Sequence, residues 1–266
     1  MGVHDITTMN LISDELHKIR PDILLYGEGW TAGASPLPDS LRALKKNAYK
    51  LKNIAVFSDD LRDGIKGTVF DINDRGFATG KPGMEESIKF GIVAAGKHPQ
   101  VNYSKVNYSK EPYTSAPWNV ISYVECHDNN TLWDKINLSY TDASEADKKK
   151  MHRLAHVIVL TSQGIPFLHA GTEFMRSKQG VENSYKSSDS INAIDWKKKN
   201  EHLVLNNFIK QLIGMRREHP AFRMKTAEQV QKYISFDEQA AAGTVVYSID
   251  GEAVNDQWKK IWIAFN

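Results

Sequence analysis

The chain has 266 residues, of which 41% are hydrophobic and 25% are charged, and its formal net charge is +2. That length accommodates one barrel-sized domain, or one domain followed by a small second one. The balanced charge gives no electrostatic reason to expect a nucleic acid or a membrane as a partner. The single cysteine, Cys126, excludes an intrachain disulfide, and no apolar run reaches membrane-spanning length.

The first predicted elements are a helix and a strand. Thr7 or Thr8 is placed to cap the helix, and Pro21 is placed to end it. The run Leu-Leu-Tyr-Gly-Glu-Gly-Trp at 24–30 then predicts a buried parallel strand that ends at Glu28. A helix that leads into a parallel strand is the middle of a βα repeat, so we expect the first strand of the repeat to lie outside this sequence.

Three more βα units follow along the chain. Apolar runs predict strands at 54–57, 120–125 and 165–171, and helical patterns occupy about 84–95, 144–162 and 201–218. The stretch 58–63 reads as a polar loop. Alternating βα units predict a parallel sheet, and because a closed (β/α)₈ barrel needs eight strands, four units predict its C-terminal half. Four strands alone leave two unpaired edges, through which we expect self-association.

The pattern changes after residue 221. Short strands are predicted at 231–235, 243–249 and 260–265, with Asp250-Gly251 as a hairpin turn between the last two. This region is typical of the start of a small β-sandwich. The predicted domains are therefore a partial catalytic barrel over 1–221 and an incomplete C-terminal β domain over 222–266.

Two of the predicted strands end in reactive side chains. Glu28 lies between two glycines and is followed by Trp30, while the strand at 120–125 leads into His127 and Asp128. In a (β/α)₈ barrel the strand ends carry the catalytic groups. The glycines leave room for a ligand, and the indole offers the flat apolar face on which sugar rings pack. Taken alone, Glu28 also fits a residue that merely ends a strand, and the His-Asp pair fits a loop hydrogen bond.

The motifs at 26–30, Tyr-Gly-Glu-Gly-Trp, and 120–129, Val-Ile-Ser-Tyr-Val-Glu-Cys-His-Asp-Asn, resemble strand-end motifs of the α-amylase superfamily, glycoside hydrolase family 13. Within that superfamily the chain more closely resembles the type I pullulanases, which are α-1,6 debranching enzymes. Residues 57–63, 164–174 and 182–185 resemble the same subgroup. The resemblance extends over essentially the whole chain.

The resemblance implies roles for three residues. Retaining glycosidases use a nucleophilic carboxylate and a second carboxyl group that donates and then accepts a proton. The resemblance assigns the acid/base role to Glu28, support of the oxocarbenium-like transition state to Asp128, and hydroxyl binding to His127. A proton donor near neutral pH needs an apolar wall and a neighbouring carboxylate, which Trp30 and Asp128 are placed to supply.

Further candidates for substrate binding lie in the loops after these strands. They are Trp30, Asn129, Asn183, Tyr185, Asp189 and Asn192, for which loop capping and packing are equally good explanations. The histidines show no convincing metal-ligand spacing, so no metal site and no cofactor are predicted, while Ca²⁺ binding is left open.

In the family, a Phe-Arg-Phe-Asp motif that carries the nucleophile would lie just before residue 1. The resemblance therefore implies a C-terminal fragment of a pullulanase that hydrolyses α-1,6 linkages in pullulan and branched α-glucans. Because loss of a nucleophile removes most of the catalysis, we expect this chain alone to be inactive.

Two alternatives remain open at this stage. One is another enzyme of the superfamily, such as an isoamylase or a branching enzyme, which uses the same three carboxylates. The other is a non-catalytic protein that binds glucan or completes a barrel with a separate N-terminal half. Cytoplasmic and secreted locations are both compatible with the resemblance.

Overall fold

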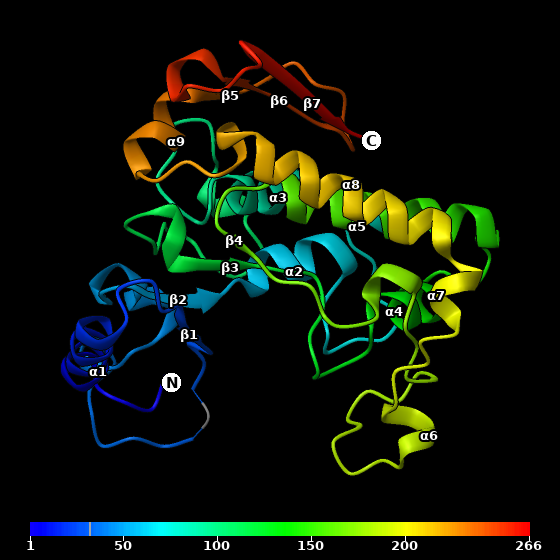
Figure 1. Ribbon diagram of the computed structural model, residues 1–266, viewed down its shortest axis with the longest axis horizontal. Helices are drawn as coiled ribbons and strands as arrows, with labels where there is room; N and C mark the ends of the chain where they lie inside the picture. The colour runs from blue at the N-terminus through cyan, green and yellow to red at the C-terminus, as the bar shows by residue number, and fades with distance from the viewer. Residues whose placement is uncertain (32) are drawn as a thin grey trace.

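The computed structural model describes residues 1–31 and 33–266, and a four-stranded parallel sheet runs through its middle (Figure 1). Its strands are β1 (Leu25–Gly27), β2 (Ile54–Phe57), β3 (Val120–Ser122) and β4 (Ile165–Pro166). They pair in chain order, so that β1 and β4 form the two edges. The predicted α/β class and the four parallel strands are confirmed. The predicted run at 165–171 pairs with β3 only at its start, where the N–H of Phe167 donates to the carbonyl of Ser122 at 2.9 Å.

Nine α-helices accompany the two sheets in the part of the chain that the structure describes. They are α1 (Ile6–Ile19), α2 (Asp59–Lys66), α3 (Glu85–Ile92), α4 (Leu132–Ser139), α5 (Glu145–Thr161), α6 (Asp189–Asn192), α7 (Lys198–Glu201), α8 (Leu203–Glu218) and α9 (Ala227–Tyr233). Helices α3, α5 and α8 lie between the parallel sheet and the antiparallel sheet (Figure 1). None of the helices in these residues combines the length and the apolar character that crossing a bilayer requires.

Two of the helix predictions are wrong, and in both cases a polar cap explains the difference. Helix α1 is capped by Asp5, whose carboxylate accepts the N–H of Thr8 at 2.8 Å, and not by a threonine. The stretch 58–63 is not a loop but the start of α2, where the Ser58 hydroxyl accepts the N–H of Leu61 at 3.3 Å. The aspartates of its first turn, Asp59 and Asp60, also favour a helix N-terminus.

Both faces of the parallel sheet are apolar. Side chains such as Ile54 and Val56 pack with the helices in the main core, whereas Ala55 and Ile121 belong to a second cluster that also includes Phe167. This division follows from the two-residue alternation of side chains along a strand. It is typical of parallel sheets that are covered on both sides.

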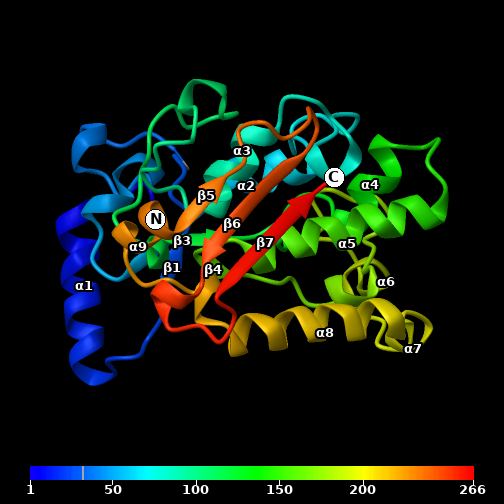
Figure 2. The same ribbon diagram turned by 90° about the horizontal axis from the view of Figure 1, so that it is seen from above.

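The second sheet is antiparallel and has three strands, β5 (Ile234–Phe236), β6 (Val245–Asp250) and β7 (Lys260–Phe265), with β6 in the centre. Figure 2 shows these strands crossing over the helical layer. The buried side chain of Tyr247 packs toward that layer, and its hydroxyl donates to the carbonyl of Thr161 at 3.3 Å. The sheet thereby shares the main core with the helices.

Two details of this region differ from prediction. The predicted strand at 231–235 begins inside α9, because Thr226 and Gln229 form a capping box that starts a helix there. Asp250-Gly251 is not a two-residue turn, since β6 and β7 are joined by residues 251–259. Gly251 has a φ of −74°, and a Cβ there would lie 1.9 Å from the carbonyl oxygen of Trp258, so close approach explains the glycine.

Ile54→Ala tests how strongly the helix-facing side of the sheet holds the fold. Ile54 is 1% exposed in a central position, so we expect the free energy of unfolding to fall by about 2–5 kcal/mol. Urea denaturation measures this loss, with Ile19→Ala as the matched control at a residue that is 83% exposed. Equal losses in the two variants would contradict the assigned core.

Candidate active site

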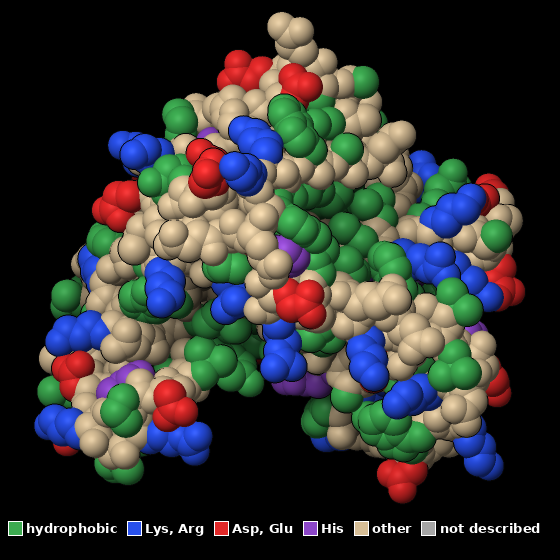
Figure 3. Space-filling model, turned by 45° about the horizontal axis from the view of Figure 1, so that its top comes forward, with side chains coloured by type: hydrophobic (Ala, Val, Ile, Leu, Met, Phe, Trp, Pro, Cys, Tyr) green, Lys and Arg blue, Asp and Glu red, His purple; other side chains and the backbone are tan. Residues whose placement is uncertain are grey.

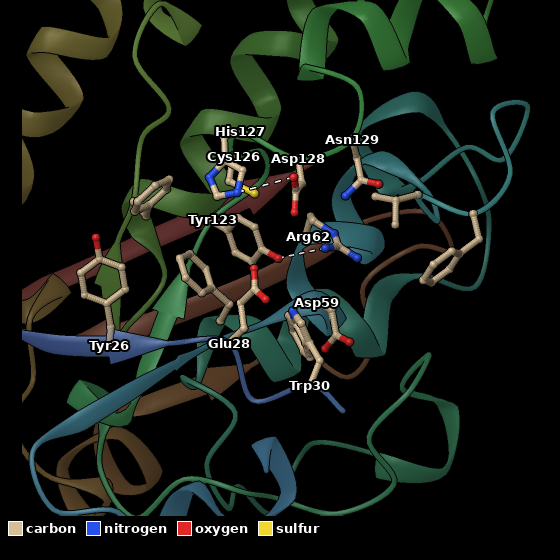
Figure 4. A pocket seen from close by; sticks show the side chains of 14 residues that line it. Tyr26, Glu28, Trp30, Asp59, Arg62, Tyr123, Cys126, His127, Asp128 and Asn129 are labelled. Atoms are coloured by element: carbon tan, nitrogen blue, oxygen red, sulfur yellow. Dashed lines mark hydrogen bonds and ion pairs between the residues drawn. The ribbon is translucent and has the colours of Figure 1, made fainter. Parts of the chain in front are cut away.

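A cavity of about 530 Å³ opens at the C-terminal ends of the parallel strands (Figure 4). Its walls come from all four strand ends and from α2 and the loop that follows it. The lining residues are Tyr26, Glu28, Trp30, Phe57, Asp59, Arg62, Val69, Phe70, Tyr123, Cys126, His127, Asp128, Asn129 and Phe167. Because parallel strands end on the same edge of a sheet, residues about a hundred positions apart meet here.

Five of the predicted site residues line this one cavity. Glu28 and Trp30 follow β1, and His127, Asp128 and Asn129 belong to the loop after β3. The side chains of His127 and Asp128 are 79% and 58% exposed, and their closest ring-nitrogen and carboxylate atoms are 3.5 Å apart. The acidic and imidazole groups are thus accessible to a ligand that enters the cavity.

The predicted residues of the later loop are placed differently. Asn183 borders a smaller cavity of about 330 Å³ that shares Asp128 and Asn129 with the first. Tyr185, Asp189 and Asn192 line neither cavity among the described residues.

These three residues belong to a segment that folds back on itself. The Asn192 amide donates to the carbonyls of Ser184 and Ser187 at 2.6 and 3.0 Å, and Asp189 begins the short helix α6. Tyr185 is 72% exposed. In Figure 1 the segment that carries α6 projects away from both sheets.

The floor of the cavity is aromatic, which the sequence analysis did not anticipate. The ring of Phe57 lies 4.9, 5.5 and 5.7 Å from those of Tyr123, Phe167 and Tyr26, always edge to face. Such pairs contribute more than their buried area alone. All four rings lie on the face of the sheet opposite the helices. The alternation of side chains along each strand was therefore the sequence signal that could have placed these rings together on one face.

A third acidic side chain, Asp59, reaches the cavity from the start of α2. The ammonium group of Lys45 donates to the carboxylates of Asp59 and Asp60 at 2.5 and 2.8 Å. Burial raises the pKa of Asp59 while Lys45 opposes the shift, and the nearby Asp60 raises the pKa further. Because Asp59 shares one lysine with a second carboxylate, its pKa stays above that of a free aspartate, and the carboxyl group holds its proton more readily.

Arg62 provides the positive charge of the cavity wall. Its guanidinium donates to the Tyr123 hydroxyl at 3.0 Å and to both carboxylate oxygens of Asp63 at 2.5 and 3.0 Å. Figure 4 shows Arg62 amid the side chains of Glu28, Asp59 and Asp128. Fixed in this way, the guanidinium can stabilise negative charge at the cavity without moving.

Glu125 lies beneath the loop that carries Asp128. It is 2% exposed, its carboxylate accepts the N–H of Leu132 at 2.7 Å, and the ring of His169 lies 3.9 Å away. Burial alone would raise the pKa of Glu125, but His169, Thr172 and Lys66 outweigh it and lower the pKa to about 2. The carboxylate thus joins the end of β3 to the start of α4 and closes the loop between them.

Cys126 is half-buried and lines the cavity. Burial raises the pKa of its thiol. In residues 1–31 and 33–266, no three or more His, Cys, Asp or Glu side chains form a group suited to a metal ion.

Known proteins resemble the chain in both sequence and structure. No family model matches it. It is 37% identical to the pullulanase of Bacillus subtilis (strain 168) over 264 residues, which cover 98% of this chain and 35% of the relative.

Two solved structures are similar over nearly the whole chain. The pullulanase of Paenibacillus barengoltzii complexed with maltohexaose and α-cyclodextrin superposes with a TM-score of 0.92 at 43% identity, covering 100% of this chain and 40% of that one. The type I pullulanase of Bacillus subtilis str. 168 complexed with maltose superposes with a TM-score of 0.90 at 35% identity, covering 99% and 35%. The chain thus spans little more than a third of the length of these relatives.

Glu125→Gln tests the buried carboxylate under the loop. A pKa of about 2 in the folded protein, against 4.5 for a free glutamate, means that Glu125 stabilises the fold above about pH 4.5 and that this contribution is lost as the pH falls toward 2. We expect the variant to lose roughly 3 kcal/mol of unfolding free energy at pH 7, and the loss to shrink at pH 3.

Urea denaturation at the two pH values measures this difference. Glu111→Gln, at an exposed loop glutamate, is the control and should change stability little at either pH. A loss in Glu125→Gln that is the same at pH 7 and pH 3 would contradict the assignment.

Proposed function

The chain is a homologue of the type I pullulanases of glycoside hydrolase family 13, and we propose that it forms part of a retaining glycosidase that cleaves α-1,6-glucosidic linkages in pullulan and branched α-glucans. The observation that carries the proposal is the convergence of Glu28 and Asp128 on one cavity at the edge of the parallel sheet. Such hydrolysis requires a nucleophilic carboxylate and a carboxyl group that donates and accepts a proton. Glu28 would supply the second of these, with Asp128 as a further carboxylate in the same cavity.

In this proposal Glu28 is the general acid and base, and Asp128 binds sugar hydroxyls and supports the oxocarbenium-like transition state. His127 binds a hydroxyl beside Asp128, with Asn129 and Asn183 as further polar contacts. Trp30 lies beside Glu28 and offers its ring to a sugar face. Their shared cavities support these roles, because each group can reach one bound ligand.

The proposed partner is an α-glucan. The similar structures from Paenibacillus barengoltzii and Bacillus subtilis are complexed with maltohexaose and maltose, respectively. In this chain the cavity combines aromatic rings with carboxylates and a fixed guanidinium. Apolar ring faces and a few oriented polar groups are the usual lining of a small-ligand site.

We further propose that residues 1–221 are half of a (β/α)₈ barrel and that residues 222–266 are part of a C-terminal β domain that packs on its helices. Three observations support the half-barrel: the four strands are parallel, they pair in chain order, and within residues 1–31 and 33–266 the outer sides of β1 and β4 have no partner strand. The aromatic second face of the sheet also fits the interior of a barrel.

An apolar groove along β4 adds support for this arrangement. It has a volume of about 830 Å³, and Ile165, Pro166, Leu168 and Ile213 lie among its lining residues. Figure 3 shows hydrophobic side chains gathered across the middle of this face of the molecule. The proposal places a further barrel strand against this edge and takes the nucleophilic carboxylate from a barrel strand outside this sequence.

Other enzymes of the superfamily are the alternative. An isoamylase or a branching enzyme would place the same carboxylates in the same positions. The products distinguish a branching enzyme from a hydrolase, since hydrolysis of pullulan releases reducing sugar whereas branching transfers a chain without releasing any.

Reducing-sugar release from pullulan tests the function. We expect no release by the 266-residue chain alone, and release when it is combined with a barrel segment that carries the Phe-Arg-Phe-Asp strand. In the combined assay Glu28→Gln should lower kcat by at least about 100-fold, because the proton donor is lost. Asp59→Asn, which alters a neighbouring cavity carboxyl group, is the matched comparison and should retain more activity.

Two results would overturn this proposal. Release by the chain alone that disappears in Glu28→Gln would mean that this chain contains its own nucleophile. A larger loss in Asp59→Asn than in Glu28→Gln would make Asp59 the proton donor.

The half-barrel proposal also predicts association through the sheet edges. Exposed main-chain groups and apolar side chains such as Leu24 and Tyr26, which are 51% and 48% exposed, lie at the β1 edge. We expect light scattering to give a mass above 30.0 kDa that rises with concentration. A monomer with a sharp, concentration-independent unfolding transition would argue against unpaired edges.

A further inference from the structure

Three lysines, Lys66, Lys135 and Lys178, have side chains buried almost completely, with exposures of 1%, 2% and 1%. Among the described residues none of the three forms an ion pair within 4 Å. Burial lowers the pKa of each ammonium group, and that of Lys66 to about 8. Nearby carboxylates, such as Glu125 for Lys66, offset part of this shift, but a buried cation that forms no direct ion pair still costs free energy, so its retention calls for an explanation.

Each of these ammonium groups donates to main-chain carbonyls of a segment beside the cavity. Lys66 donates to Asn130 at 3.1 Å, and Lys178 donates to His127 at 3.0 Å and to Glu182 at 3.2 Å. Two buried lysines thus hold the two ends of the segment 127–130 by its backbone.

The third lysine does the same for the opposite wall. The Lys135 ammonium donates to the carbonyls of Thr68, Asp71 and Ile72. Between these carbonyls lie Val69 and Phe70, which line the cavity. The three lysines together contact both loops that follow α2 and β3.

The exposed side chains of the segment 127–130 cannot supply this support themselves. His127 and Asp128 project into the open cavity and have their 3.5 Å contact with each other. Asn129 has a left-handed φ of 62°, which asparagine adopts more readily than most residues with a side chain. Because the side chains of His127 and Asp128 do not tie the loop to the rest of the fold, we expect it to need anchors on its main chain to keep one geometry.

We propose that Lys66, Lys135 and Lys178 are positioning residues, which hold the two loops around the cavity in the geometry that substrate binding and hydrolysis require. The catalytic part of this proposal rests on the proposed function. The anchoring of the loops can be measured without any substrate. An ammonium group suits the role, because it donates up to three hydrogen bonds and each is strengthened by the charge.

Two probes in the chain report on the loops separately. Cys126, the single cysteine, begins the first loop, so its rate of alkylation reports on opening there. Phe70 is 88% exposed in the second loop, so chymotryptic cleavage after it reports on that loop. Alkylation is followed as a function of pH in each variant, because Lys66 also affects the thiol pKa, and the rate constant of the ionised thiol, fitted from the whole pH profile, isolates exposure.

Lysine-to-methionine variants test the proposal, since methionine fills the same volume without donating. We expect Lys66→Met and Lys178→Met to speed the alkylation of Cys126 about 10-fold and to leave cleavage after Phe70 unchanged. Lys135→Met should do the reverse, so each variant is a control for the others. In the combined pullulan assay, Lys66→Met should lower kcat about 10- to 100-fold with a much smaller change in KM.

Several outcomes would overturn the proposal. One is that the rates at both probes stay unchanged in all variants. The others are that every variant reacts faster at both probes, or that none of the three variants folds. Either of these last two results would mark the lysines as general core residues. If Lys66→Met alone fails to fold, Lys178→Met carries the test of the same loop. Probe rates that change as expected without any pullulan hydrolysis would uphold the anchors and refute the proposed function instead.

Discussion

The parallel direction of β1 to β4 is the constraint on which the rest of the molecule depends. Parallel strands must each be followed by a crossover, and all their C-terminal ends lie on one edge of the sheet. Glu28, Asp59 and Asp128 follow three successive strands and therefore meet at one cavity although the chain separates them by up to a hundred residues. The site is a consequence of the strand direction, and the loops only refine it.

The same sheet couples the core to the site. Its helix-facing side contributes to the main core, whereas Phe57, Tyr123 and Phe167 on the other side pack on one another and form the floor of the cavity. An apolar sheet face of this kind is stable when something covers it. In the half-barrel proposal, further strands and a bound sugar cover this apolar face. The strands that close the barrel therefore also complete the wall of the site.

Sequence patterns predicted what depends on local order and missed what depends on contacts between distant segments. The apolar runs before Glu28 and His127 identified two strand ends, because burial, alternation and an abrupt change to polar chemistry are visible within a few residues. Helix α4 was missed because its buried apolar residues, Leu132 and Ile136, give little periodicity, and a Thr131 cap starts it. Asp189 was grouped with the site by its neighbours in sequence, yet α6 projects away from both sheets.

Lys66 and Glu125, two buried groups beneath the cavity, affect the fold at opposite ends of the pH range. The pKa of Lys66 is about 8 in the folded protein against an ordinary value of 10.5, so the free energy of unfolding rises as the pH increases from about 8 to 10.5. The neutral amine can still donate to the Asn130 carbonyl. When Glu125 gains a proton in acid, the charge that His169 and Lys66 stabilise is lost, and its hold on the Leu132 N–H weakens. Alkaline titration of Lys66 therefore leaves a neutral donor to the Asp128 loop, whereas acid titration of Glu125 weakens the contact between the carboxylate and the start of α4.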